Sequence, residues 1–212
     1  MPDLNLKQLD QAIDIGDATG VSYTRVETTG FLEATGSAIA YRDEYASFAW
    51  LEAGGRTAPD KRDHVIGGVD RRVYCFDGGT EEEVLSNCFE IPHDYAYGQP
   101  IEVHAHFRPS TNASGDVKLF FDWEHSPIFS APQAQTSLSF VHTINSNEQY
   151  YHILVAFGDL PDLGFELGDK IGFNVRRTPT DSQDTYGDDL ILEQVALHIP
   201  VNTNGSRQRY VK

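Results

Sequence analysis

Cysteine and positive charge are both scarce in this chain. Only Cys75 and Cys88 occur in 212 residues, and their spacing fits no Cys-x-x-Cys redox or zinc motif. We expect two small core residues with free thiols; a disulfide is the alternative, which a reducing compartment disfavours. Lysine and arginine number 16 against 32 aspartates and glutamates, a formal net charge of −16. A surface this acidic repels phosphate backbones, so we expect no nucleic-acid partner.

Long apolar runs and catalytic motifs are also absent from the sequence. No basic flank precedes an apolar stretch near the N-terminus, and no segment has the length of a membrane helix. We therefore expect neither a signal peptide nor a membrane partner. Hydrolase elbows, phosphate-binding loops and zinc-protease motifs do not occur. The sequence predicts no catalytic residue, no cofactor and no enzymatic activity.

Period-two alternation of apolar and polar residues is the main pattern that the sequence does contain. Val117, Leu119, Phe121 and Trp123 alternate with polar residues, which is typical of a half-buried strand. Similar patterns predict roughly nine strands, around residues 45–51, 73–76, 84–91, 101–107, 117–123, 138–143, 151–157, 171–175 and 191–201. Turn residues separate these segments, and nothing long and helical lies between them. The prediction is an all-β, antiparallel β-sandwich of jelly-roll type.

Two regions lack this alternation. Residues 1–40 contain several glycines and at most a short helix with a few apolar side chains, which predicts an extended N-terminal arm ordered by contact with a partner. The sandwich then spans 41–205 and a C-terminal tail spans 206–212. The polar stretch 52–70 reads as a long loop. The residues that we expect to contact a partner are Leu4, Leu6, Leu9, Ile13 and Trp50.

The most suggestive histidines are His104 and His106. Residues two apart on a strand project from the same face, so the pair is a weak candidate for a metal site. With Gly98 it satisfies the opening Gly-x5-His-x-His half of the cupin metal motif, but the glutamate that should follow is missing from Phe107 to Asn112. We expect both side chains on a polar sheet face or at a subunit contact, and a cupin-like metalloenzyme is the weakest alternative.

Exposed aromatic residues would mark a sugar-binding face. The candidates are Trp50, Trp123, Tyr150, Tyr151 and Tyr210. Periodicity favours burial for Trp123, whereas Trp50 lies nearer the arm and is equally suited to face a partner.

Four segments together resemble a family of virion-associated proteins of tailed bacteriophages. They are Ile-Pro-His-Asp-Tyr at 91–95, Ile-Glu-Val-His-Ala-His-Phe-Arg-Pro at 101–109, Gly-Asp-Val at 115–117 and Asn-Gly-Ser-Arg-Gln-Arg-Tyr-Val-Lys at 204–212. The similarity spans roughly residues 70–212 and leaves the N-terminal part outside.

The resemblance implies a virion structural protein, a capsid decoration or cement protein that binds the head lattice. Its partner would be the major capsid protein or another virion protein, and it would assemble as a homotrimer. The protein would be located in the virion, which is assembled in the host cytoplasm. The alternative is a receptor- or carbohydrate-binding module of a phage tail or head fibre, since jelly rolls bind sugars through loops and surface aromatics.

Overall fold

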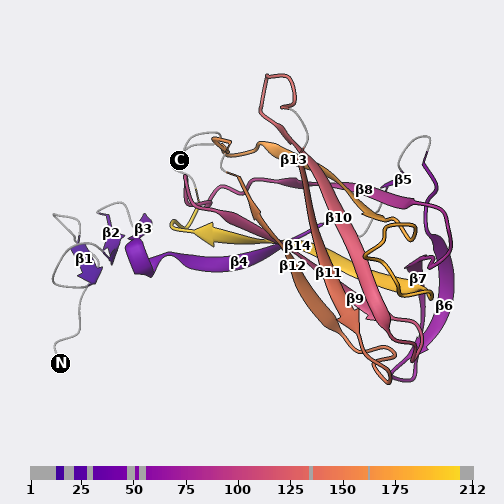
Figure 1. Ribbon diagram of the computed structural model, residues 1–212. Helices are drawn as coiled ribbons and strands as arrows, with labels where there is room; N and C mark the ends of the chain where they lie inside the picture. Colours follow the sequence, from indigo (N-terminus) through magenta and orange to yellow (C-terminus); the bar gives the residue numbers. More distant parts are fainter. Residues whose placement is uncertain are drawn as a thin grey trace, which may run out of the picture.

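Two antiparallel sheets packed face to face form the body of the protein (Figure 1). The computed structural model describes residues 13–16, 22–27, 31–46, 51–52, 56–133, 136–161 and 163–205. The six-stranded sheet has the order β12 (Ile153–Leu160), β9 (Ile101–Pro109), β14 (Leu190–Val201), β7 (Val69–Phe76) and β6 (Asp60–Ile66), with β4 (Ala40–Tyr45) also paired to β14. The five-stranded sheet has the order β11 (Thr136–Ile144), β10 (Gly115–Ser126), β13 (Lys170–Arg177), β8 (Glu83–Glu90) and β5 (Leu51–Glu52).

The connectivity is that of a jelly roll. From β7 to β14 the chain changes sheet at every step except between β10 and β11. The resulting strand orders, β7-β14-β9-β12 and β8-β13-β10-β11, are those of two interlocked Greek keys. The predicted jelly-roll sandwich is confirmed.

The core lies between the sheets and follows the alternation in the sequence. Val117, Leu119, Phe121 and Trp123 of β10 are all buried, as predicted. The Phe121 ring stacks on Phe173 of β13 with centroids 4.8 Å apart. Every second side chain of a strand points into the core, and the side chains between them point outward. Each sheet therefore has one outward face.

Strand β14 has different neighbours along its length. Residues 190–192 pair with β7, whereas residues 196–201 pair with β4. A register irregularity between Leu192 and Gln194 separates these two parts of β14. The consequence is that β4 joins the six-stranded sheet and places Tyr41, Asp43 and Tyr45 on its outward face beside β14.

The long loop predicted for 52–70 is wrong. Residues 60–66 form β6, which is joined to β7 by a turn at Gly67 and Gly68 with φ of 58° and 83°. Strand β6 is at the edge of its sheet and carries charged residues, which protect edge strands from aggregation. The same charged residues remove the alternation of apolar and polar residues by which a strand is recognised in the sequence.

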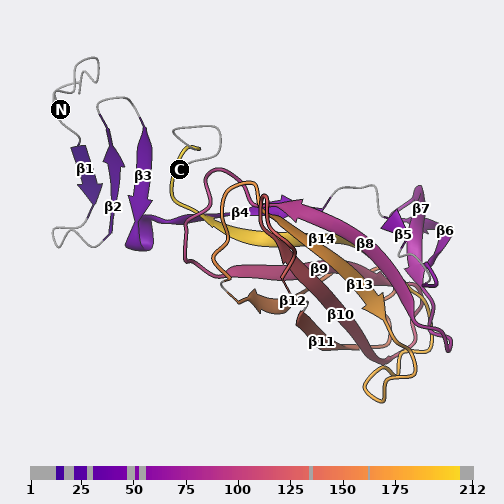
Figure 2. The same ribbon diagram turned by 90° about the horizontal axis from the view of Figure 1, so that it is seen from above.

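Part of the region predicted as an N-terminal arm, residues 1–40, forms strands. Strands β1 (Ile13–Gly16), β2 (Tyr23–Val26) and β3 (Leu32–Thr35) form a small sheet at one end of the sandwich, followed by the 3-10 turn η1 (Gly36–Ala38) (Figure 2). Four-residue strands are too short to show sustained alternation. The Ala34 N–H donates to the Asn202 carbonyl at 2.6 Å, which ties the small sheet to the end of β14.

Of the expected partner contacts, Ile13 is the first residue of β1. Leu4, Leu6, Leu9 and Trp50 lie outside the described residues, as does the tail 206–212.

Both cysteines are free thiols. Cys75 is buried, as expected, but Cys88 is exposed because it lies at an outward position of β8. In the described part of the chain, no helix has the length and apolar character needed to cross a membrane.

Candidate functional site: a histidine and tyrosine face

His104 and His106 lie on the outward face of the six-stranded sheet. Their neighbours Val103, Ala105 and Phe107 face the core, so period two turns both histidines away from it. The two rings lie edge to face with centroids 5.1 Å apart. The prediction that they share a sheet face is confirmed.

Other rings extend this pair into a row across the sheet. The ring of His152, just before β12, lies 5.0 Å from that of His106. On the other side, the ring of His198 of β14 lies 6.3 Å from that of His104 and stacks on Tyr41 of β4 at 5.1 Å. The row therefore joins four segments that lie side by side, β12, β9, β14 and β4 (Figure 1).

Hydrogen bonds fix both ends of the row. His106 Nδ1 and His152 Nε2 are 2.8 Å apart, and His198 Nδ1 lies 2.9 Å from a carboxylate oxygen of Asp43. His104 is only 4% exposed, and its Nε2 has no partner among the described residues, nor has that of His106. Burial lowers the pKa of His104 and also that of His106, where nearby His104 and His152 lower it further. Both rings are therefore held neutral at neutral pH.

Metal ligation has no support from this row. Within the described segments, no group of three or more His, Cys, Asp or Glu side chains is placed to hold a metal ion. His104 and His106 contact neighbouring rings instead.

A pocket of about 280 Å³ opens beside the row. It is lined by Tyr45, Arg71, His106, His152, Glu193 and Gln194. Arg71 donates to Glu193 at 2.6 Å, and Arg108 forms a second ion pair with Glu193 at 2.9 Å. Burial opposes ionisation of Glu193, but the hydrogen bonds from the two arginines hold its pKa below the usual value. The polar floor of the pocket is thus charged and fixed in place before any ligand arrives.

An exposed tyrosine, Tyr45, borders this polar floor, and Tyr41 lies further along the same strand, stacked on His198. Tyr45 is 54% exposed and Tyr41 is 56% exposed, although both project from a paired strand. Exposed rings beside fixed hydrogen-bonding groups suit a ligand that has a flat apolar surface and a rim of polar groups.

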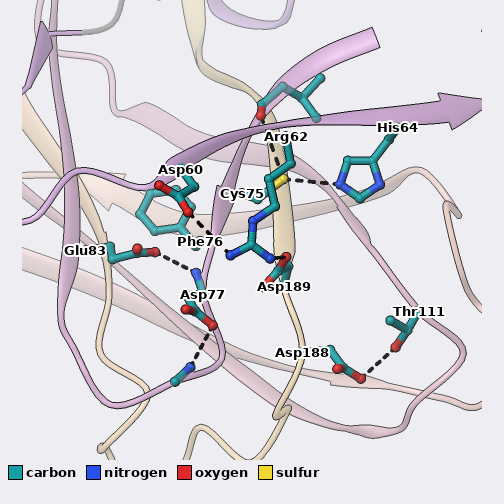
Figure 3. A network of polar contacts seen from close by, with 12 residues as sticks. Asp60, Arg62, His64, Cys75, Phe76, Asp77, Glu83, Thr111, Asp188 and Asp189 are labelled. Carbon is teal, nitrogen blue, oxygen red and sulfur yellow. Dashed lines mark hydrogen bonds and ion pairs between the residues drawn. The ribbon is translucent and has the colours of Figure 1, made fainter. Parts of the chain in front are cut away.

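A polar network adjoins the face where β6, β7 and the beginning of β14 meet (Figure 3). Arg62 forms an ion pair with Asp189, and Cys75 Sγ lies 3.4 Å from Nε2 of His64. Burial raises the pKa of the Cys75 thiol to about 11. These contacts join β6 to β7 and to the residue that precedes β14.

No family model and no curated protein matches the chain. Several solved structures resemble it. The xylan-binding CBM22-1 domain from Paenibacillus barcinonensis is similar with a TM-score of 0.38 and 8% identity, covering 74% of this chain and 88% of that one. CBM27-1 from Caldicellulosiruptor saccharolyticus, in complex with mannohexaose, is similar with a TM-score of 0.39 and 14% identity, covering 74% of this chain and 97% of that one. The family 11 carbohydrate-binding module from Clostridium thermocellum, in complex with a β-1,3-1,4-mixed-linked tetrasaccharide, is similar with a TM-score of 0.40 and 8% identity, covering 74% of this chain and 96% of that one.

The aromatic candidates chosen from the sequence do not form this face. Trp123 is in the core, Tyr150 is partly buried with its hydroxyl 3.2 Å from His64, and Tyr151 is exposed. Trp50 and Tyr210 lie outside the described residues.

Sequence reasoning missed the residues that β4 and β14 contribute. The expected strand at 45–51 begins where β4 ends, at Tyr45. A signal for a shared strand face was available in the sequence, because residues two positions apart on a strand project from the same side. Tyr41, Asp43 and Tyr45 have this spacing.

Proposed function

We propose that this protein binds carbohydrate, and that its ligand is a glycan chain held at the pocket beside Tyr45. The supporting observation is the position of an exposed tyrosine next to polar groups that are already fixed by one another. A binding role also suits the jelly-roll fold, in which outward sheet faces are available for ligands.

The chemistry of the pocket fits a sugar. A pyranose has an apolar face of C–H groups, which packs on an aromatic ring, and a rim of hydroxyls that both donate and accept hydrogen bonds. Glu193 accepts such bonds, Arg71 donates them, and the amide of Gln194 does both. Because Arg71 and Glu193 are paired before binding, little side-chain entropy is lost when the ligand is bound.

The virion location remains a proposal that rests on the sequence resemblance. A glycan-binding module on a phage particle would attach the particle to polysaccharide at the host surface. The capsid-protein partner and the trimer are likewise predictions of the resemblance, and light scattering of the purified protein tests the trimer as a multiple of 23.6 kDa.

The decisive experiment is a glycan array followed by calorimetry. The array includes xylan, mannohexaose and mixed-linked gluco-oligosaccharides. We expect a neutral glycan to bind and Tyr45→Ala to weaken its affinity roughly fivefold or more, the equivalent of about 1 kcal/mol for one lost contact.

Phe129→Ala is the matched control, because Phe129 is a fully exposed aromatic in the loop after β10, outside the pocket. It should leave the affinity unchanged. A blank array, or equal losses in both variants, contradicts the proposal.

A further inference from the structure

A groove of about 330 Å³ lies on the five-stranded sheet, on the opposite side of the sandwich from the histidine and tyrosine face. Its lining residues are Ser86, Asn87, Asp122, Trp123, Glu124, Gly172, Phe173 and Asn174. Gly172 of β13 lies between its strand partners Glu124 of β10 and Cys88 of β8. The missing side chain at Gly172 leaves the hollow in the middle of the sheet.

Beside Gly172, four polar side chains form a row across the strands. Ser137, Asp122, Asn174 and Ser86 are successive partners on β11, β10, β13 and β8. Neighbouring strands are about 4.8 Å apart, so the row offers polar groups at regular short intervals. Ser137 donates to Asp122 at 2.7 Å, and Ser86 donates to Asn174 at 2.6 Å. These bonds hold the row in one arrangement.

The charges in the groove select against an anionic ligand. Arg176 Nε donates to Asp122 at 2.6 Å and neutralises it, while the guanidinium carbon lies 3.8 Å from the centroid of the Phe120 ring. Glu124 forms no ion pair with any described residue, and the amide nitrogen of Asn174 donates to none of them. The Glu124 carboxylate accepts from the Ser126 hydroxyl at 3.3 Å but has no counter-ion, so it repels anions and can accept further hydrogen bonds from hydroxyls. The amide nitrogen of Asn174 can donate to hydroxyl oxygens.

We infer that this groove is a second glycan site, which binds sugar hydroxyls and excludes anionic sugars. The inference rests on the proposed function for the ligand class, but uses none of the residues of the first site. The two sites lie on the outward faces of two sheets that pack face to face, so they face opposite directions. One copy of the protein then holds two glycan chains and bridges them, which raises avidity on a polysaccharide surface.

Cys88 provides a direct readout of the groove. It is exposed, free and next to Gly172, whereas burial keeps the other thiol, Cys75, from reacting. A thiol reagent added to the intact protein therefore reports on Cys88. We expect at least one neutral oligosaccharide from a panel of xylohexaose, mannohexaose and mixed-linked glucotetraose to slow this labelling several-fold.

Gly172→Leu is designed to fill the groove without unfolding the protein. The three atoms nearest to a Cβ at this position all belong to the flexible side chain of Glu124, with Oε1 at 2.9 Å and Cγ at 3.3 Å, so that side chain must shift slightly. The variant should lose the protection of Cys88, halve the number of sugars bound per chain in calorimetry and keep the thermal midpoint within a few degrees. Asn174→Ala should weaken protection without filling the groove.

Tyr45→Ala separates the two proposals. It should leave the protection of Cys88 intact while weakening binding at the first site. If the panel binds with one sugar per chain and never protects Cys88, the second site is wrong and the first stands. If Cys88 is protected but Tyr45→Ala has no effect on affinity, the groove is the glycan site and the proposed site is wrong. Absence of both binding and protection overturns both.

Discussion

Nδ1 of His106 and Nε2 of His152 lie 2.8 Å apart, so the N–H of one imidazole donates a hydrogen bond to the ring nitrogen of the other. The bond requires that at least one of the two facing nitrogens carries no proton. Both residues line the pocket in which we place the sugar, so their protonation and ligand binding are coupled.

The first prediction is that glycan affinity falls in acid. The pKa of His106 is lowered by burial and by neighbouring His104 and His152, so its ring becomes charged only in acid. A protonated His106 places a positive charge among the neighbouring rings that line the pocket. We expect affinity to fall roughly fivefold, about 1 kcal/mol, between about pH 7.5 and pH 5, measured by calorimetry. His152→Ala should bind more weakly at neutral pH and lose this dependence; an unchanged pH profile in the variant contradicts the coupling.

The second prediction concerns stability in acid. Burial lowers the pKa of His104 in the folded protein below its ordinary value of 6.5. The unfolded chain therefore binds the proton first, and the free energy of unfolding falls as pH drops below about 6.5. Urea midpoints of the parent and of His104→Gln, measured across this range, should diverge, with the variant less sensitive to acid. Parallel curves would show that His104 does not contribute.

The third prediction concerns a residue that lowers the stability of the protein as pH rises rather than as it falls. Glu83 is buried, accepts the Asp77 N–H at 2.5 Å, and burial raises its pKa to about 7 (Figure 3). The folded state disfavours the charged carboxylate. The free energy of unfolding therefore falls as pH rises from about 4.5 to about 7, and the whole loss is present above about pH 7. Glu83→Gln should stabilise the protein by up to about 3 kcal/mol at about pH 8 and by almost nothing at about pH 4. Urea denaturation at both pH values measures this difference; equal gains would exclude ionisation as the cause.

The fourth prediction tests a buried ion pair that organises the chain before β14. Arg177 Nη2 lies 2.9 Å from Asp184, both side chains are almost fully buried, and Arg177 also donates to the carbonyl of Asp188 at 2.7 Å. Arg177→Met leaves the Asp184 charge buried without a counter-ion, with only the Lys118 N–H still donating to it, which costs about 3–5 kcal/mol. Thermal denaturation should show the loss. The double variant with Asp184→Leu should recover part of it, because no buried charge remains, and a double variant no better than the single one contradicts this explanation.

Alternation in the sequence was sufficient to predict most of the sandwich. The strands with the clearest period two, around 117–123, 171–175 and 191–201, appear as β10, β13 and β14. It failed where a strand is polar at a sheet edge, as in β6, or only four residues long, as in β1 to β3. Such strands bury too little apolar surface to leave a periodic signal.

The sequence by itself determined the fold class, the burial of Trp123 and the common face of His104 and His106, because each follows from side chains alternating along one strand. Only the tertiary structure decided which distant residues join them. His152, His198, Tyr41 and Tyr45 reach the same face through the pairing of β12, β14 and β4 with their neighbours. The groove at Gly172 likewise depends on the register of β13 between β8 and β10, and register is set by packing of whole sheets rather than by any local segment.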